Sequence, residues 1–125
     1  MKLTSLFARL ITPRPQRTPA GALPVHEASM NFDLENIAPF LTELEAREKL
    51  GLRVGELTAF TKDTKVGKER SKRLSVPFQG STVDLEYRVF MDDVDSPDIY
   101  FLTSSNGLAD VILSEMRAFM GKHGL

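Results

Sequence analysis

The stretch RLSVPFQGSTVDLEYRVFM, residues 73–91, decides the fold. Apolar and polar side chains alternate on both sides of the central turn Gln79-Gly80-Ser81, and a period of two is typical of strands with one buried face. The sequence therefore predicts an antiparallel hairpin. The apolar side chains of the hairpin are Leu74, Val76, Phe78, Val83, Leu85, Tyr87, Val89 and Met91.

The register of this hairpin follows from its pattern. Pairing Phe78 with Val83 and Leu74 with Tyr87 places the large apolar side chains on one face of the sheet. Pro77 has no amide hydrogen to donate, so its strand is predicted to lie at a sheet edge or to turn that position outward. The opposite face is predicted to be polar and carries Asp84, Glu86 and Arg88.

Four segments around the hairpin complete the predicted fold. Apolar residues recur at helical spacing in residues 37–50 and 108–120, so both segments are predicted helices. Residues 99–102 are apolar on both sides, as in a central or helix-covered strand, and residues 52–61 carry a weaker strand pattern. The order predicts an α+β fold: a helix, about four antiparallel strands in a meander, and a helix, with both helices packed on one sheet face.

The composition of the chain changes near Met30. Residues 1–29 carry four basic side chains against Glu27, a net charge of +3, and residues 30–125 carry the remaining −4. Prolines interrupt residues 12–24, as in an extended linker. We therefore expect a flexible basic N-terminal arm, residues 1–29, followed by a single α+β domain. The basic side chains of the arm are Lys2, Arg9, Arg14 and Arg17.

The beginning of the arm predicts a short amphipathic helix, because its apolar side chains form one helical stripe. A helix this short needs a surface to lie on. Its candidate partner-binding residues are Leu3, Leu6, Phe7, Leu10 and Ile11. The arm also resembles a mitochondrial transit peptide in its basic character and its Ser and Thr content.

Other interpretations of the arm are a disordered leader, translation that begins at Met30, docking on a partner or on the domain itself, and binding to a membrane surface. We expect a cytoplasmic protein, or a mitochondrial-matrix protein if the arm is a transit peptide. No apolar stretch approaches the roughly 18 to 20 residues that cross a bilayer, so an integral membrane protein is not expected.

The residue types present restrict the chemistry. The chain has no cysteine, which excludes disulfides, thiolate nucleophiles and cysteine-ligated metal centres. Its two histidines, His26 and His123, fall outside the predicted core, which disfavours catalysis by an oriented histidine. An enzyme built from the remaining residue types would use carboxylates, lysine, tyrosine or an unassisted serine. We expect no cofactor.

A basic run in residues 62–73 is the candidate contact for nucleic acid or phosphate. It holds six basic side chains against Asp63 and Glu69, a local charge of +4. The run has no aromatic residue on which bases could stack, and a solvated loop is its alternative interpretation. The candidate phosphate-binding residues are Lys65, Lys68, Arg70, Lys72 and Arg73.

An acidic loop follows the hairpin and gathers four aspartates, Asp92, Asp93, Asp95 and Asp98, within seven residues. Hard divalent cations prefer such oxygen ligands, so the loop is a candidate calcium or magnesium site, which Asp84, Glu86 or Glu115 would complete. The loop lacks the turn glycine and distal glutamate of an EF-hand, and a solvated turn also accounts for it.

Three functions remain open at this point. A small non-enzymatic protein-binding or adaptor module comes first, because no catalytic set is recognised, and its contact would be a sheet edge, the charged loops or the arm. A nucleic-acid or phosphate binder using the basic run is the alternative, and a carboxylate-based, divalent-metal-dependent enzyme is the second alternative. The opposite charges of the two loops also suggest a head-to-tail homodimer, or pairing within one chain.

Overall fold

A computed structural model describes residues 25–123 of the chain. The elements in this range are β1 (His26–Asn31), η1 (Leu34–Asn36), α3 (Ile37–Glu48), α4 (Val54–Lys62), β2 (Glu69–Phe78), β3 (Ser81–Phe90), β4 (Asp98–Thr103) and α5 (Asn106–Lys122). All strand pairs are antiparallel, and the sheet order is β1-β4-β3-β2. The predicted α+β class is therefore confirmed, with β2, β3 and β4 as the meander.

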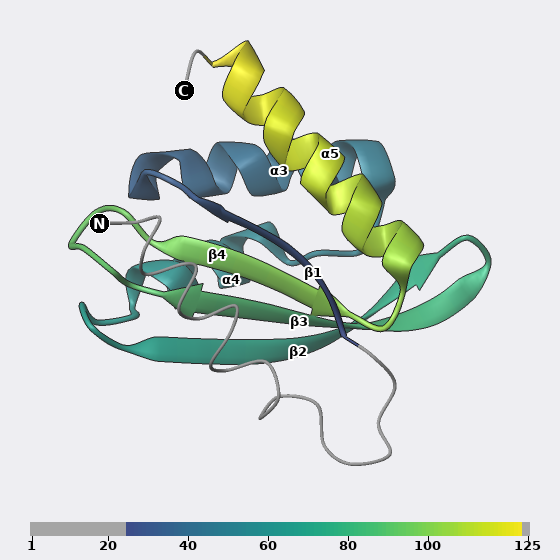
Figure 1. Cartoon of the computed structure of the whole chain (residues 1–125), viewed down its shortest axis with the longest axis horizontal. Coiled ribbons are helices and arrows are strands. Elements are labelled where there is room, and N and C mark those ends of the chain that lie inside the picture. Colours follow the sequence, from purple (N-terminus) through teal and green to yellow (C-terminus); the bar gives the residue numbers. More distant parts are fainter. Residues whose placement is uncertain (1–24, 124–125) are drawn as a thin grey trace.

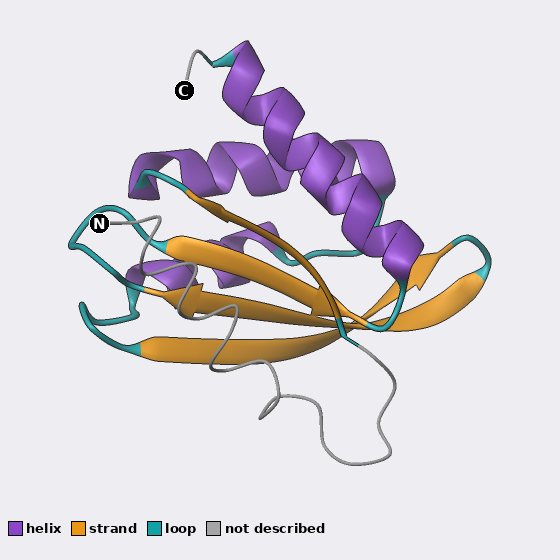
Figure 2. Cartoon of the chain, in the orientation of Figure 1, coloured by secondary structure: helices purple, strands orange, loops and turns teal. Residues whose placement is uncertain are grey.

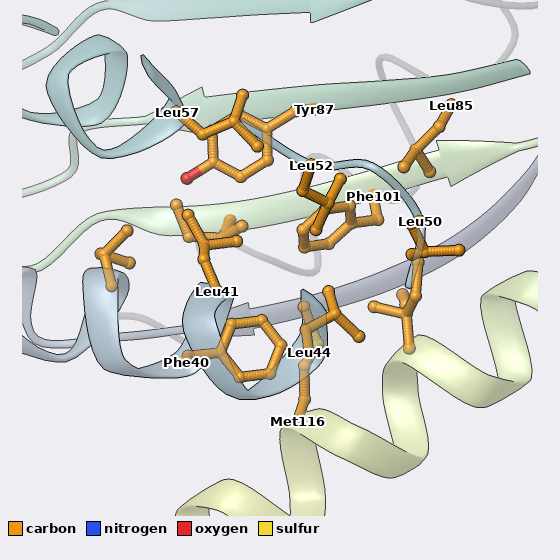
Figure 3. Close-up of a cluster of buried hydrophobic side chains, with 14 of the residues drawn as sticks. Phe40, Leu41, Leu44, Leu50, Leu52, Leu57, Leu85, Tyr87, Phe101 and Met116 are labelled. Atoms are coloured by element: carbon orange, nitrogen blue, oxygen red, sulfur yellow. The ribbon is translucent and has the colours of Figure 1, made fainter. Parts of the chain in front are cut away.

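The α-helices α3, α4 and α5 lie on the same side of the sheet (Figures 1 and 2). Of these, α3 and α5 are the two helices predicted from the sequence, and both contact the sheet. Their apolar stripes meet the sheet in one core, in which Phe40 and Leu44 of α3 and Met116 of α5 approach Phe101 of β4 (Figure 3). The N-terminus of α5 is capped by Ser105, whose Oγ accepts a hydrogen bond from the Leu108 amide at 3.1 Å.

The hairpin forms where the sequence predicts it, but the predicted register is wrong by two residues. Phe78 pairs with Ser81 and Leu74 pairs with Leu85. The turn contains only Gln79 and Gly80, both with positive φ, which is the tight turn whose twist matches paired strands. Because the shift is an even number of residues, the apolar side chains still share one face. The prediction that Pro77 lies in an edge strand is confirmed, since β2 pairs with β3 and with no other strand of residues 25–123.

The strand predicted over residues 52–61 is wrong, because residues 54–62 form the helix α4. Leu57 and Thr61 are its buried residues, and they lie four positions apart, one helical turn. In addition, Phe60 packs against the core. The short segment contains too few turns for its helical period to stand out from an irregular strand pattern.

The strand β1 was not predicted from the sequence. It pairs along its whole length with β4, and Ala28 is fully buried in the core beneath the helices. The boundary that the sequence predicts between arm and domain, at Met30, therefore falls inside a strand of the sheet. A strand made of His, Glu, Ala, Ser, Met and Asn contains none of the β-branched or aromatic residues typical of strands.

Candidate functional site

The residues predicted to bind a partner through the arm, Leu3, Leu6, Phe7, Leu10 and Ile11, lie outside the described residues. Within residues 25–123, no helix is long and apolar enough to cross a membrane. Both histidines lie at the ends of elements, His26 at the beginning of β1 and His123 at the end of α5.

The basic residues predicted to bind phosphate do not gather on one surface. Lys65 and Lys68 precede β2 in an exposed turn. Arg70 and Lys72 project from β2 to the helix side, where the Arg70 guanidinium carbon lies 4.2 Å from the ring centre of Phe60 in α4. This arrangement divides the positive charge between the two faces, because the last candidate, Arg73, belongs to the opposite face of the sheet.

Several of these charges also have partners within the chain. Lys72 Nζ lies 3.8 Å from Glu56 of α4, and Arg73 Nε lies 4.0 Å from Glu86, its cross-strand neighbour. Arg88 of β3 reaches Glu69 of β2 at 2.7 Å. Some of the opposite charges that suggest head-to-tail docking are therefore paired between β2 and β3 of one molecule.

The four aspartates of the acidic loop, Asp92, Asp93, Asp95 and Asp98, do not converge. Asp98 is buried on β4 and accepts a hydrogen bond from Asn31 Nδ2 at 2.8 Å, while Asp93 accepts one from the adjacent amide of Val94. Across the part of the chain that the structure describes, no three acidic or histidine side chains are placed to hold a metal ion. The hypothesis of a divalent-metal enzyme gains no support from this geometry.

A shallow depression of about 490 Å³ lies beside this loop. Its lining combines three carboxylates with one lysine and one leucine: Asp33, Leu34, Glu35, Lys62 and Asp95. A backbone hydrogen bond joins two of its lining residues, since the Leu34 amide donates to Asp95 O at 2.7 Å. An open depression with mostly like charges offers neither an apolar wall nor converging donors and acceptors for a small molecule.

A polar cluster that was not predicted from the sequence joins the ends of α3 and α5. Glu43 lies 3.3 Å from Lys122 Nζ and 3.6 Å from His123 Nε2. Desolvation raises the pKa of Glu43, but hydrogen bonds and positive charge from Lys122 and His123 outweigh this effect and hold the pKa below its ordinary value. The contacts join residues about eighty positions apart, which no local pattern could reveal.

The edge of the sheet formed by β2 is the longer of the two sheet edges among the described residues. β2 is ten residues long and pairs with β3 over its whole length, and no strand in residues 25–123 pairs with its other side. β1, the other edge, has six residues. On β2 the outer-face positions, Glu69, Ser71, Arg73, Ser75 and Pro77, are all exposed.

No protein-family model matches the chain, and no curated protein or solved structure was found that matches it.

Proposed function

We propose that this domain is a non-enzymatic protein-binding module whose partner adds an extended segment to the open edge of β2. The observation that carries the proposal is the long strand with one unpaired edge among the described residues. Addition of a strand satisfies a row of main-chain donors and acceptors at once, which makes it a common mode of peptide recognition.

The two-residue turn fixes which backbone groups of β2 face outward. In such a hairpin the residues that flank the turn, Phe78 and Ser81, form a hydrogen-bonded pair, and every second pair from there repeats this pattern. The even-numbered residues of β2 therefore direct their amides to β3. Ser71, Arg73 and Ser75 direct their N–H and C=O groups to the open edge, and Pro77, which has no N–H, falls in the same outward series.

The side chains along this edge favour an acidic partner segment. Arg73 and Lys72 lie on opposite faces of β2, so an added strand would meet a positive charge on each of its faces. The nearby carboxylates Glu56 and Glu86 lie 3.8 Å and 4.0 Å from these charges, which leaves both cations with hydrogen-bonding capacity for a further partner. Opposite charges on neighbouring strands stabilise pairing and select the partner.

A proline placed in the outward series tests this proposal. Ser75→Pro removes an outward N–H and adds a bulky ring at the edge, without removing a bond of the β2–β3 ladder. We expect the free energy of unfolding to change by less than about 1 kcal/mol. In a pull-down from source-cell extract followed by titration of the identified protein, the unaltered chain and the control Ser75→Ala should bind, and Ser75→Pro should not.

Hydrogen exchange gives an independent readout at the same residues. The amides of Ser71, Arg73 and Ser75 should exchange quickly in the free protein and slowly in the complex, whereas the amide of Leu74 is protected in both. Equal binding by Ser75→Pro would exclude the β2 edge as the contact. Retention that nuclease abolishes would instead favour the basic run as a nucleic-acid contact.

A further inference from the structure

The helix-side positions of β2 change character along the strand. Arg70 and Lys72 come first, and their cationic groups lie 4.2 Å and 5.8 Å from the ring centre of Phe60 in α4. Leu74 and Val76 follow, of which Leu74 is partly buried against the core and Val76 is 2% exposed. The helix side of this strand is therefore cationic at its beginning and apolar in its middle.

The outward backbone groups of β2 determine how closely the side chains of a partner approach these positions. Since Ser71, Arg73 and Ser75 direct their N–H and C=O groups to the open edge, each would form a hydrogen-bonded pair with an antiparallel partner strand. The residues between them, Lys72 and Leu74, would then occupy non-hydrogen-bonded pairs, in which opposing side chains stand closer together. Selection of partner side chains is therefore strongest on the helix side of the edge.

The helix α4 already presents a carboxylate to this edge. Glu56 of α4 lies 3.8 Å from Lys72 Nζ, and it also lies 3.3 Å from the guanidinium of Arg53. The Glu56 side chain is 50% exposed, so this contact with Lys72 is solvated and weak. A carboxylate on a partner strand, which main-chain bonds hold in place, can therefore replace Glu56 at Lys72.

Two features of β2 disfavour a second copy of this chain as the partner. The strand carries three basic residues and one acidic residue, so antiparallel pairing of two such strands brings like charges together. In addition, Pro77 lies in the outward series and has no amide hydrogen, which interrupts the row of outward donors. The edge is therefore suited to a short segment of opposite charge.

We propose that the partner segment runs antiparallel to β2 and carries an apolar residue opposite Leu74, followed by acidic residues opposite Arg73 and Lys72. This inference rests on the proposed addition of a strand at this edge and names the class of segment that the edge selects. Antiparallel pairing is the more stable arrangement per residue, and the pairs β1–β4, β4–β3 and β3–β2 all use it. The acidic residue opposite Lys72 is also within diagonal reach of Arg70.

Two synthetic peptides of identical composition test the order of these residues. The first peptide has seven residues, with valine third, glutamate fourth and fifth, and threonine elsewhere, and the second has the reversed sequence. In an NMR titration of the full chain, the first should bind about fivefold more tightly, because only its glutamates reach Arg73 and Lys72 while its valine meets Leu74. Equal affinity for the two peptides would overturn the proposal, and so would absence of binding by both.

Two charge variants with effects of opposite sign locate the contact. Lys72→Gln should weaken binding of the first peptide about threefold, and Glu56→Gln should strengthen it by a similar factor, because Glu56 competes for the same ammonium group. Lys65→Gln removes an exposed lysine from the turn before β2, and as the matched control it should leave the affinity unchanged. Equal weakening by Lys65→Gln and Lys72→Gln would reduce the effect to net charge and overturn the proposal.

Hydrogen exchange distinguishes failure of this inference from failure of the proposed function. Slow exchange at Ser71, Arg73 and Ser75 with the source-cell partner, together with equal affinities for the two peptides, would retain the edge contact and refute the sequence preference. Fast exchange of these amides in every complex would exclude the edge itself. Light scattering on the chain alone should give the mass of one copy, and a dimer with protected β2 amides would assign the edge to a second copy instead.

Discussion

The two faces of this sheet are both buried along β4, but in different ways. Toward the helices, Phe101 and Ile99 join a continuous core with α3 and α5. Toward the other side, Tyr100 and Leu102 are buried outside that core and among carboxylates. One face is closed by packing of apolar surfaces, and the other combines buried apolar side chains with charged ones.

Because of this difference, we expect the two faces to contribute to stability with different sensitivity to salt. Core packing against rigid helices is insensitive to salt, because it depends on apolar area and close contact. The ion pairs of the other face, such as that between Arg88 and Glu69, are weakened by salt and by charge reversal. Stability measurements on matched residues of the two faces can therefore distinguish the two kinds of burial.

The largest expected effect comes from one leucine on each face. Leu85, 2% exposed, lies in the core, and Leu102, 5% exposed, lies on the outer face. Leu85→Ala should lower the free energy of unfolding by about 2 to 5 kcal/mol, because it leaves a cavity in a packed core. Leu102→Ala should cost about 1 to 2 kcal/mol, because it removes apolar area beside the charged side chains Glu86 and Glu27 rather than from the packed core. Urea denaturation of both variants measures the two losses.

A smaller effect is expected from the buried hydrogen bond between β3 and α4. Thr61 Oγ1 donates to Leu57 O at 2.7 Å, so the Tyr87 hydroxyl, 2.6 Å from Thr61 Oγ1, acts as the donor in that pair. Burial raises the pKa of Tyr87 above its ordinary value, and the bond to Thr61 offsets only part of this rise. The hydroxyl therefore stays protonated and able to donate.

Tyr87→Phe should lower the free energy of unfolding by about 1 to 2 kcal/mol, and Thr61→Val by a similar amount, because each leaves one polar group without its partner. The double variant should cost less than the sum of the two losses. Additive losses would contradict a direct bond.

The two faces also differ in how much of them the sequence predicts. The alternation in residues 73–91 is strong because each strand has one polar and one apolar face, and it predicts the hairpin. The missing amide hydrogen of Pro77 predicts the edge position of its strand. The register escapes prediction because a shift of two residues preserves the faces, and only the compact turn at Gln79-Gly80 determines it. The helix α4 has too few turns to be recognised.

The candidate sites were harder to predict for a related reason. β1 is recognisable only through its pairing with β4, some seventy residues away. Residues 99–102 were correctly expected to be apolar on both sides, and β4 does lie between two strands. Charge counts along the chain could not reveal that Arg70 and Arg73 belong to opposite faces.

The smallest expected effect concerns pH and the polar rim between α3 and α5. Burial and a hydrogen bond with the Glu48 carboxyl raise the pKa of Glu115, although Arg47 Nε lies 3.5 Å away and acts in the opposite direction. The folded state therefore holds this proton more tightly than the unfolded state does. Its contribution to stability is complete below the ordinary glutamate pKa and is lost as the pH rises through the raised value.

Glu115→Gln should accordingly flatten the dependence of stability on pH between about pH 4 and pH 7. Glu43→Gln provides a control of opposite sign, because the lowered pKa of Glu43 stabilises the fold above the ordinary glutamate pKa and this contribution is lost on acidification. Urea denaturation between about pH 2 and pH 7 covers the windows of both residues. An unchanged pH profile for Glu115→Gln would mean that its carboxyl titrates alike in the folded and unfolded chain.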